Sequence, residues 1–99
     1  MFNLTENETK VLLILTESCL NGMGGDRPSD LEHDEYTWIE PSDLPSSEYT
    51  PKQRSGFFSS LIQKGVIEDW GSDNTGKQEW VLATAAWQYA DTIWDNYKK

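Results

Sequence analysis

The stretch from Thr50 to Trp70 places cationic, hydroxyl and amide side chains on one predicted helix. Lys52, Arg54 and Lys64 occur in it with no carboxylate between positions 51 and 66. The 99-residue chain carries 17 acidic and 8 basic residues, so this segment reverses the overall charge. Ammonium and guanidinium groups bind anions such as phosphate, and amide side chains hydrogen-bond to polar edges. The segment is therefore the first candidate for an anion-binding surface.

Helical periodicity divides this segment into an apolar and a polar side. At about 100° per residue, Phe57, Phe58, Leu61 and Ile62 define the buried side, and Arg54 projects nearer to it than Lys52 does. An ordinary solvated helix face would carry the same polar residue types, so that alternative stays open. The polar side, its flanks and the tip of a following hairpin give these candidate contact residues: Lys52, Gln53, Arg54, Ser55, Gly56, Ser59, Ser60, Gln63 and Lys77.

The first half of the chain predicts one long helix and a polar connection. Thr5 and Glu8 form a capping box ahead of an apolar run, so the helix should span about Glu6 to Leu20,. Gly22 can end it. The connection should contain, in order, an exposed acidic loop at about 22–36, a short strand at Tyr36–Ile39 and one short helical turn at Pro41–Leu44,.

The second half predicts a capped helix, a hairpin and a closing helix. Thr50 and Gln53 form a second capping box, Pro51 suits the first helical position, and Gly65 ends the helix,. The remaining elements are strands at Val66–Trp70 and Glu79–Ala83 and a last helix capped by Thr84,.

Together these elements predict an α+β, mainly helical domain in the order helix, strand, helix, helix, strand, strand, helix. LTENETKVLLIL resembles the first helix of MarR-type winged-helix regulators, and SSLIQKGVIED resembles their L-x-x-K-G-x-I junction between recognition helix and wing. WVLATAAWQYAD is similar to their third strand and following helix. The resemblance implies a single winged helix-turn-helix domain over residues 1–99, with a two- to three-stranded wing sheet. It also implies a small transcriptional regulator whose recognition helix enters the major groove of double-stranded DNA.

Charge favours a second interpretation. The formal net charge is −9, and the acids between Asp26 and Glu48 are opposed only by Arg27. Repulsion of phosphate within a Debye length of about 8 Å predicts weak or dimer-dependent DNA binding. An acidic surface also suits a basic protein partner. The alternative is an acidic protein-interaction module, or a phage- or mobile-element-type DNA mimic that inhibits a basic nucleic-acid-handling protein; acids that serve only solubility remain a third interpretation.

Aromatic residues crowd the closing helix. Trp87, Trp94 and Tyr97 spread over more than one of its faces, which predicts a homodimer interface,. The alternative is that Trp94 and Tyr97 pack on the first helix.

No pattern indicates an enzyme. His33 lies among acids but lacks the spacing of a zinc or calcium motif, and the glycines at 22–25 follow a helix, whereas a phosphate-binding loop follows a strand,. We therefore expect no catalytic residue, no metal site and no cofactor. The apolar run at 11–15 is too short to span a membrane and no export signal is visible, so we expect no membrane partner and a cytoplasmic location.

Overall fold

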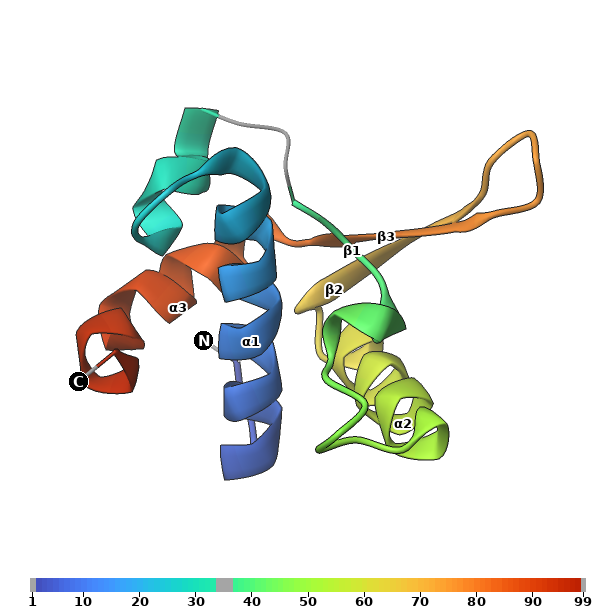
Figure 1. The fold of residues 1–99 in the computed structure, drawn as a ribbon, viewed down its shortest axis with the longest axis horizontal. Helices are drawn as coiled ribbons and strands as arrows, with labels where there is room; N and C mark the ends of the chain where they lie inside the picture. The colour runs from blue at the N-terminus through green and yellow to red at the C-terminus, as the bar shows by residue number, and fades with distance from the viewer. Residues whose placement is uncertain (1, 34–36, 99) are drawn as a thin grey trace.

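The structure is a computed structural model that describes residues 2–33 and 37–98. Within these residues it is α+β, with three α-helices and a three-stranded antiparallel sheet (Figure 1). None of the described helices is long and apolar enough to cross a membrane. The elements are α1 (Glu6–Met23), the 3-10 helix η1 (Pro28–His33), β1 (Trp38–Ile39), the 3-10 helix η2 (Pro41–Asp43), α2 (Pro51–Gln63), β2 (Ile67–Ser72), β3 (Gln78–Leu82) and α3 (Thr84–Tyr97).

Helix α1 begins where predicted and ends later. The Thr5 hydroxyl accepts a hydrogen bond from the Glu8 N–H at 3.1 Å, and Glu8 Oε1 accepts one from the Thr5 N–H at 2.8 Å. Gly24, and not Gly22 as predicted, ends the helix. Its φ of 76° is left-handed, a conformation that glycine adopts without a Cβ clash, and its N–H donates to Leu20 O,.

The acidic segment after α1 is partly built into the core, which corrects the prediction of an exposed loop. Leu31 of η1 is 1% exposed and Pro28 is buried as well. Burial of these apolar side chains stabilises the position of this segment, although its acidic composition predicted that it would be exposed to solvent. Residues 34–36, the end of the predicted loop and the start of the predicted strand at Tyr36, lie outside the described residues.

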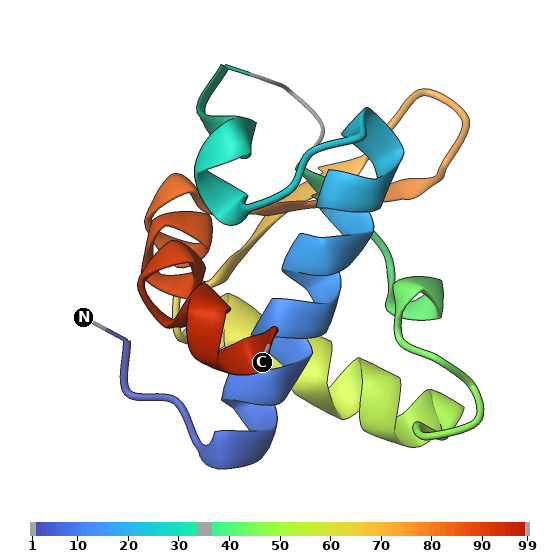
Figure 2. The same cartoon turned by 60° about the vertical axis from the view of Figure 1, so that its left-hand side comes forward.

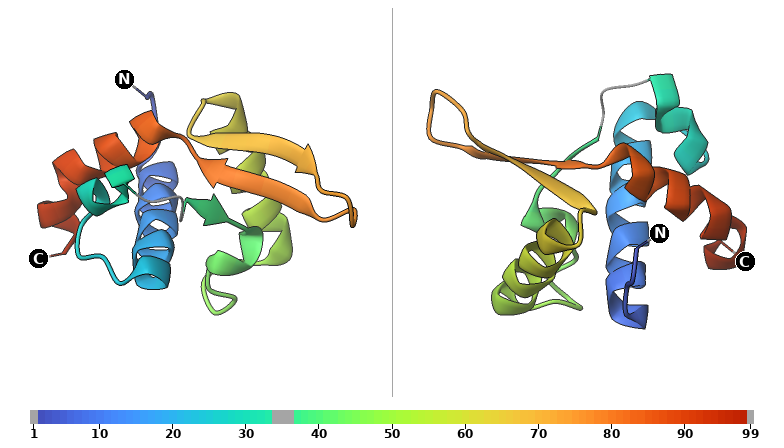
Figure 3. Two further views of the ribbon diagram at one scale, coloured as in Figure 1. Left: turned by 90° about the horizontal axis from the view of Figure 1, so that it is seen from above. Right: turned by 180° about the vertical axis from the view of Figure 1, so that it is seen from behind.

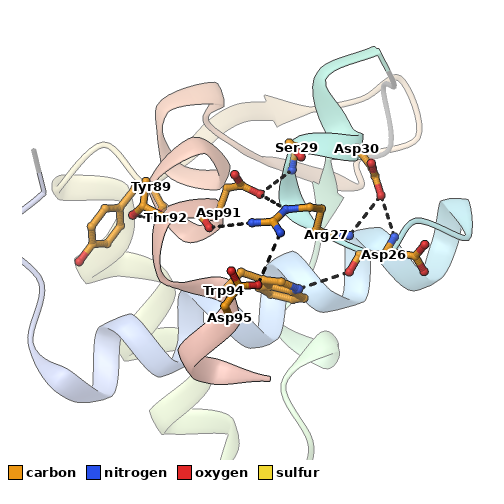
Figure 4. Close-up of polar contacts among 9 residues, drawn as sticks. All are labelled: Asp26, Arg27, Ser29, Asp30, Tyr89, Asp91, Thr92, Trp94 and Asp95. Atoms are coloured by element: carbon orange, nitrogen blue, oxygen red, sulfur yellow. Dashed lines mark hydrogen bonds and ion pairs between the residues drawn. The ribbon is translucent and has the colours of Figure 1, made fainter. Parts of the chain in front are cut away.

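Polar contacts tie the same segment to α3 (Figure 4). Arg27 Nε donates to Asp91 Oδ1 at 2.9 Å, and the Ser29 N–H donates to the same oxygen at 3.2 Å. Trp94 Nε1 donates to Asp26 O at 3.3 Å. These contacts hold η1 over α3, and α3 also lies beside α1 (Figure 2).

The turn predicted at 41–44 is a 3-10 helix, so the structure has three α-helices where four helices were predicted. Pro45 follows Leu44 and disfavours helical backbone at that residue, which stops the turn before an α-helix forms,. Leu44 is fully buried and secures η2 against the core.

Helix α2 confirms the predicted start and stop. Thr50 and Gln53 form the capping box, and Pro51 is the first helical residue. Gly65, with a φ of 80°, follows the helix and turns the chain into β2.

The sheet has the strand order β1-β3-β2, and each strand starts or ends within a few residues of its predicted position. Seen from above in Figure 3, left, β2 and β3 lie over α2, and α1 lies to one side of them. An irregularity interrupts β2 between Asp69 and Ser72. The paired residues are Trp38 with Val81, Ile39 with Trp80, Ile67 with Leu82, Glu68 with Val81 and Asp69 with Trp80.

Helix α3 completes the core. Ala83 occupies the N-cap position and makes no side-chain cap, so the prediction that Thr84 caps this helix is wrong; Thr84 is its first residue. Trp87 and Trp94 are 6% and 4% exposed and belong to the core cluster.

Candidate functional site

One side of α2 faces solvent. A Cβ placed on Gly56 would meet no heavy atom within 4 Å, which is consistent with an uncovered side. The opposite side packs through Phe58 and Leu61, which are 3% and 0% exposed. The predicted division of this helix into apolar and polar sides is therefore confirmed. The candidate residues of α2 that the structure leaves exposed are Lys52, Gln53, Ser55, Gly56, Ser59 and Gln63.

Ser60 of α2 and Lys64, the residue that follows the helix, turn toward α1. Lys64 Nζ donates to Glu8 Oε1 at 2.6 Å and to Asn3 O at 3.0 Å, and the Ser60 hydroxyl donates to Glu8 Oε2. Glu8 is only 5% exposed. The hydrogen bonds from Lys64 and Ser60 lower the pKa of Glu8 from its ordinary 4.5 to about 2. The Ser60 hydroxyl is therefore occupied by Glu8, which contradicts the assignment of Ser60 to an open contact surface. The Glu8 carboxylate also offsets the charge of Lys64.

Arg54 lies at the edge of the exposed side, as its position in the periodicity predicts. It is half-buried, and its Nε is fully enclosed with no hydrogen-bond partner among the described residues. Lys52 is exposed at the first turn of α2. Of the three cations in this segment, Lys52 is thus the best placed to meet a ligand.

The tip of the β2–β3 hairpin holds the last candidate, Lys77. The Asp73 carboxylate accepts from the Thr75 hydroxyl at 2.6 Å, the Thr75 N–H at 2.8 Å and the Lys77 N–H at 2.9 Å. These bonds lower the pKa of Asp73, the Thr75 hydroxyl contributing most. The carboxylate thus organises the turn, and the Lys77 side chain remains exposed.

Ion pairs inside the chain engage further cations. Arg27 pairs with Asp91 and Asp95, and Lys98 pairs with Glu17. Within the described ranges, the lysines and arginines without an ion pair are Lys10, Lys52, Arg54 and Lys77. Few positive charges therefore remain available on the surface for an anionic partner.

The burial of Trp87 and Trp94 contradicts their assignment to a dimer interface. Both side chains fill the core of one chain, so neither is offered to a second copy. Tyr97 is half-buried, with its ring centroid 5.3 Å from that of Trp94. This arrangement agrees with the alternative in which the aromatics of the closing helix pack within the domain.

Two other tryptophans form a surface that the sequence pattern did not indicate. Trp38 and Trp70 are 47% and 59% exposed, although strand tryptophans in a small domain are expected mostly in the core,. Their ring centroids lie 5.2 Å apart at an interplanar angle of 79°. Trp38 and Trp70 lie far apart in the sequence, and they come together because β1 and β2 both pair with β3.

Comparisons of the chain with protein-family models, curated proteins and solved structures found no match. Function is therefore inferred from the residues of this chain alone.

Proposed function

We propose that the chain is a small winged-helix protein that contacts double-stranded DNA through the exposed side of α2 and the β2–β3 hairpin. The observation that carries the proposal is the uncovered polar side of α2, immediately followed by a hairpin that projects from the domain (Figure 1). In this arrangement η2 and α2 would form the helix-turn-helix, and the hairpin would be the wing. Such a helix enters the major groove while the wing contacts the neighbouring backbone.

The roles of the side chains follow from their chemistry. Lys52, at the first turn, would neutralise a phosphate, and Lys77 would do so from the hairpin. Gln53 or Gln63 can hydrogen-bond to an adenine edge. The small residues between them, Ser55, Gly56 and Ser59, permit close approach of the helix to the groove. Arg54 would contact the backbone at the edge of this surface.

The number of available cations sets the strength of binding. With Lys64 paired to Glu8, the surface offers Lys52, Arg54 and Lys77, so one chain neutralises about two or three phosphates,. The logarithm of affinity should then fall with the logarithm of salt at a slope of about −2 to −3. A regulator of this kind would bind weakly as a monomer.

Lys52→Gln should weaken binding to duplex DNA severalfold at low salt and make the salt slope shallower by about 1, because one phosphate contact is lost. Fluorescence anisotropy over a salt series measures both quantities. The matched control is Gln88→Glu on the exposed side of α3, which changes the net charge by the same amount. Equal weakening by the two variants, or no binding by the wild type at low salt, would contradict the proposal.

A second candidate function is that of an acidic module or DNA mimic. The observation that favours it is the engagement of Arg27, Lys64 and Lys98 in ion pairs within a chain of net charge −9. The wild-type chain should then displace labelled duplex from a purified basic DNA-binding protein. Replacing the exposed Glu32 and Glu48 by glutamine should weaken this displacement at low salt,. Displacement unaffected by the two substitutions would count against the mimic.

A further inference from the structure

The sheet has two chemically different faces. Residues paired across neighbouring strands share a face, and successive residues alternate. Ile39, Ile67 and Leu82 belong to the face that packs on the core, where Trp80 also meets Phe58 of α2. None of the helices that the structure describes covers the opposite face of β2 and β3 in Figure 3, left. The register places Trp38, Val81 and Glu68 on this outer face. Trp70 lies beside Trp38, and Glu79 lies two positions before Val81 and so shares its face.

The outer face carries its own small apolar cluster. Val81 is 4% exposed but does not belong to the main core cluster, and it shares its face with the exposed Trp38 and Trp70. Two large aromatic side chains left about half exposed side by side are unusual for a single chain in solution. Exposed aromatic side chains that lie side by side are suited to an interaction surface.

Acidic groups surround the aromatic pair. Trp70 Nε1 donates to Glu68 Oε1 at 3.4 Å, so a carboxylate lies against the indole. On the other side Trp38 borders a hollow of ≈ 320 Å³ beside β3. Among the residues that the structure describes, the charged ones lining this hollow are the acids Glu40, Asp43, Asp73 and Glu79 and the cation Lys77.

The same hollow follows a strand edge that β1 leaves uncovered. Strand β1 is two residues long and pairs only with Trp80 and Val81, whereas β3 extends back to Gln78. Gln78 and Glu79 both line the hollow. An extended segment from a partner can lie along such an edge and place alternate side chains toward the sheet.

We propose that this outer face binds a basic, extended segment of another protein. Lysine or arginine side chains of the segment would stack on Trp38 and Trp70 and pair with Glu68 and Glu79. Charge selects this occupant over two others. Duplex DNA would bring phosphates against carboxylates, and a second copy of this chain would bring one acidic face against another. The site lies on the face of the sheet opposite α2, so it does not depend on DNA contact by that helix, although Lys77 of the hairpin tip belongs to both proposed surfaces.

The test uses the full chain and a defined pair of peptides. One peptide of about ten residues alternates arginine with valine, and the other has glutamate at each arginine position. NMR titration of the labelled chain should shift the indole N–H signals of Trp38 and Trp70 with the basic peptide. The basic peptide should bind at least about tenfold more tightly than the acidic one, and salt should weaken it. Equal affinities, or shifts confined to α2, would overturn the proposal.

Substitutions localise the effect. Trp70→Ser should weaken the basic peptide about fivefold or more through loss of the cation–π contact. Glu68→Gln should weaken it severalfold while leaving both indoles in place. Glu6→Gln, which removes an exposed carboxylate from the first turn of α1, is the matched control and should change nothing. A wild-type dimer in sedimentation that Trp70→Ser dissociates would identify a second copy as the occupant and overturn the proposal.

Discussion

Replacing Glu8 by glutamine should lower the free energy of unfolding by about 2 kcal/mol at pH 7, as measured by urea denaturation. Glu8 is almost fully buried and accepts hydrogen bonds from the Lys64 ammonium, the Ser60 hydroxyl and the Thr5 N–H. Glutamine can still accept from the Thr5 N–H, as Gln53 does in the second capping box. The substitution therefore removes the charge at position 8 and retains the cap.

The effect should depend on pH in a defined direction. The folded-state pKa of Glu8, about 2, lies below its ordinary 4.5, so the folded state favours the carboxylate. Its contribution is complete above about pH 5 and is lost as the pH falls from about 5 to 2. The difference in stability between wild type and Glu8→Gln should therefore shrink over that interval. A difference that stays constant down to pH 2 would contradict the ion-pair explanation.

The second capping box supplies the matched control. Gln53 is exposed and caps α2 with the same Thr-x-x-Gln geometry that Glu8→Gln would create at α1. Gln53→Glu should change stability by less than about 0.5 kcal/mol, because water solvates its charge. If both substitutions lowered the free energy of unfolding strongly, the loss would come from the capping boxes and not from the buried ion pair of Glu8 with Lys64.

Trp94→Ala should lower the free energy of unfolding by about 3–5 kcal/mol, the cost of removing a large buried aromatic side chain. Trp94 is 4% exposed, packs beside Tyr97 and donates from Nε1 to Asp26 O, so it joins α3 to the segment after α1. Urea denaturation at two protein concentrations measures the effect. The decrease in the free energy of unfolding should be the same at both protein concentrations, because the contacts of Trp94 lie within one chain.

Trp70→Ala provides the comparison for this prediction. It removes a side chain of the same type that is 59% exposed, so its cost should be well below that of Trp94→Ala,. If Trp94→Ala instead left the monomer stable and only abolished a dimer, Trp94 would belong to an interface, as the sequence pattern first suggested.

The features that sequence predicted well are local ones. The starts of α1 and α2 depend on a side chain that bonds a backbone group three residues away, so Thr5 and Thr50 identify them without knowledge of the fold,. The stop of α2 at Gly65 is also local. The start of α3 was misplaced by one residue because Thr84, which resembles a cap, is already helical and Ala83 precedes it without a side-chain cap.

The candidate site was only partly predictable for the same reason. Periodicity correctly separated the buried Phe58 from the exposed Lys52, since both follow from the geometry of one helix,. It could not show that Ser60 and Lys64 meet Glu8, which lies in another helix and far away in the sequence.

In this protein, local residue patterns specify the order of the α-helices and strands, the caps of two helices and the polar side of α2, because each depends on residues a few positions apart. Long-range packing establishes which tryptophans are covered and which cations remain available. Trp94 is buried and Trp70 is exposed, although both occur in regular secondary-structure elements. Lys64 becomes paired because α1 packs against α2. Burial and pairing depend on which distant segments meet, and local patterns of residue type do not specify that.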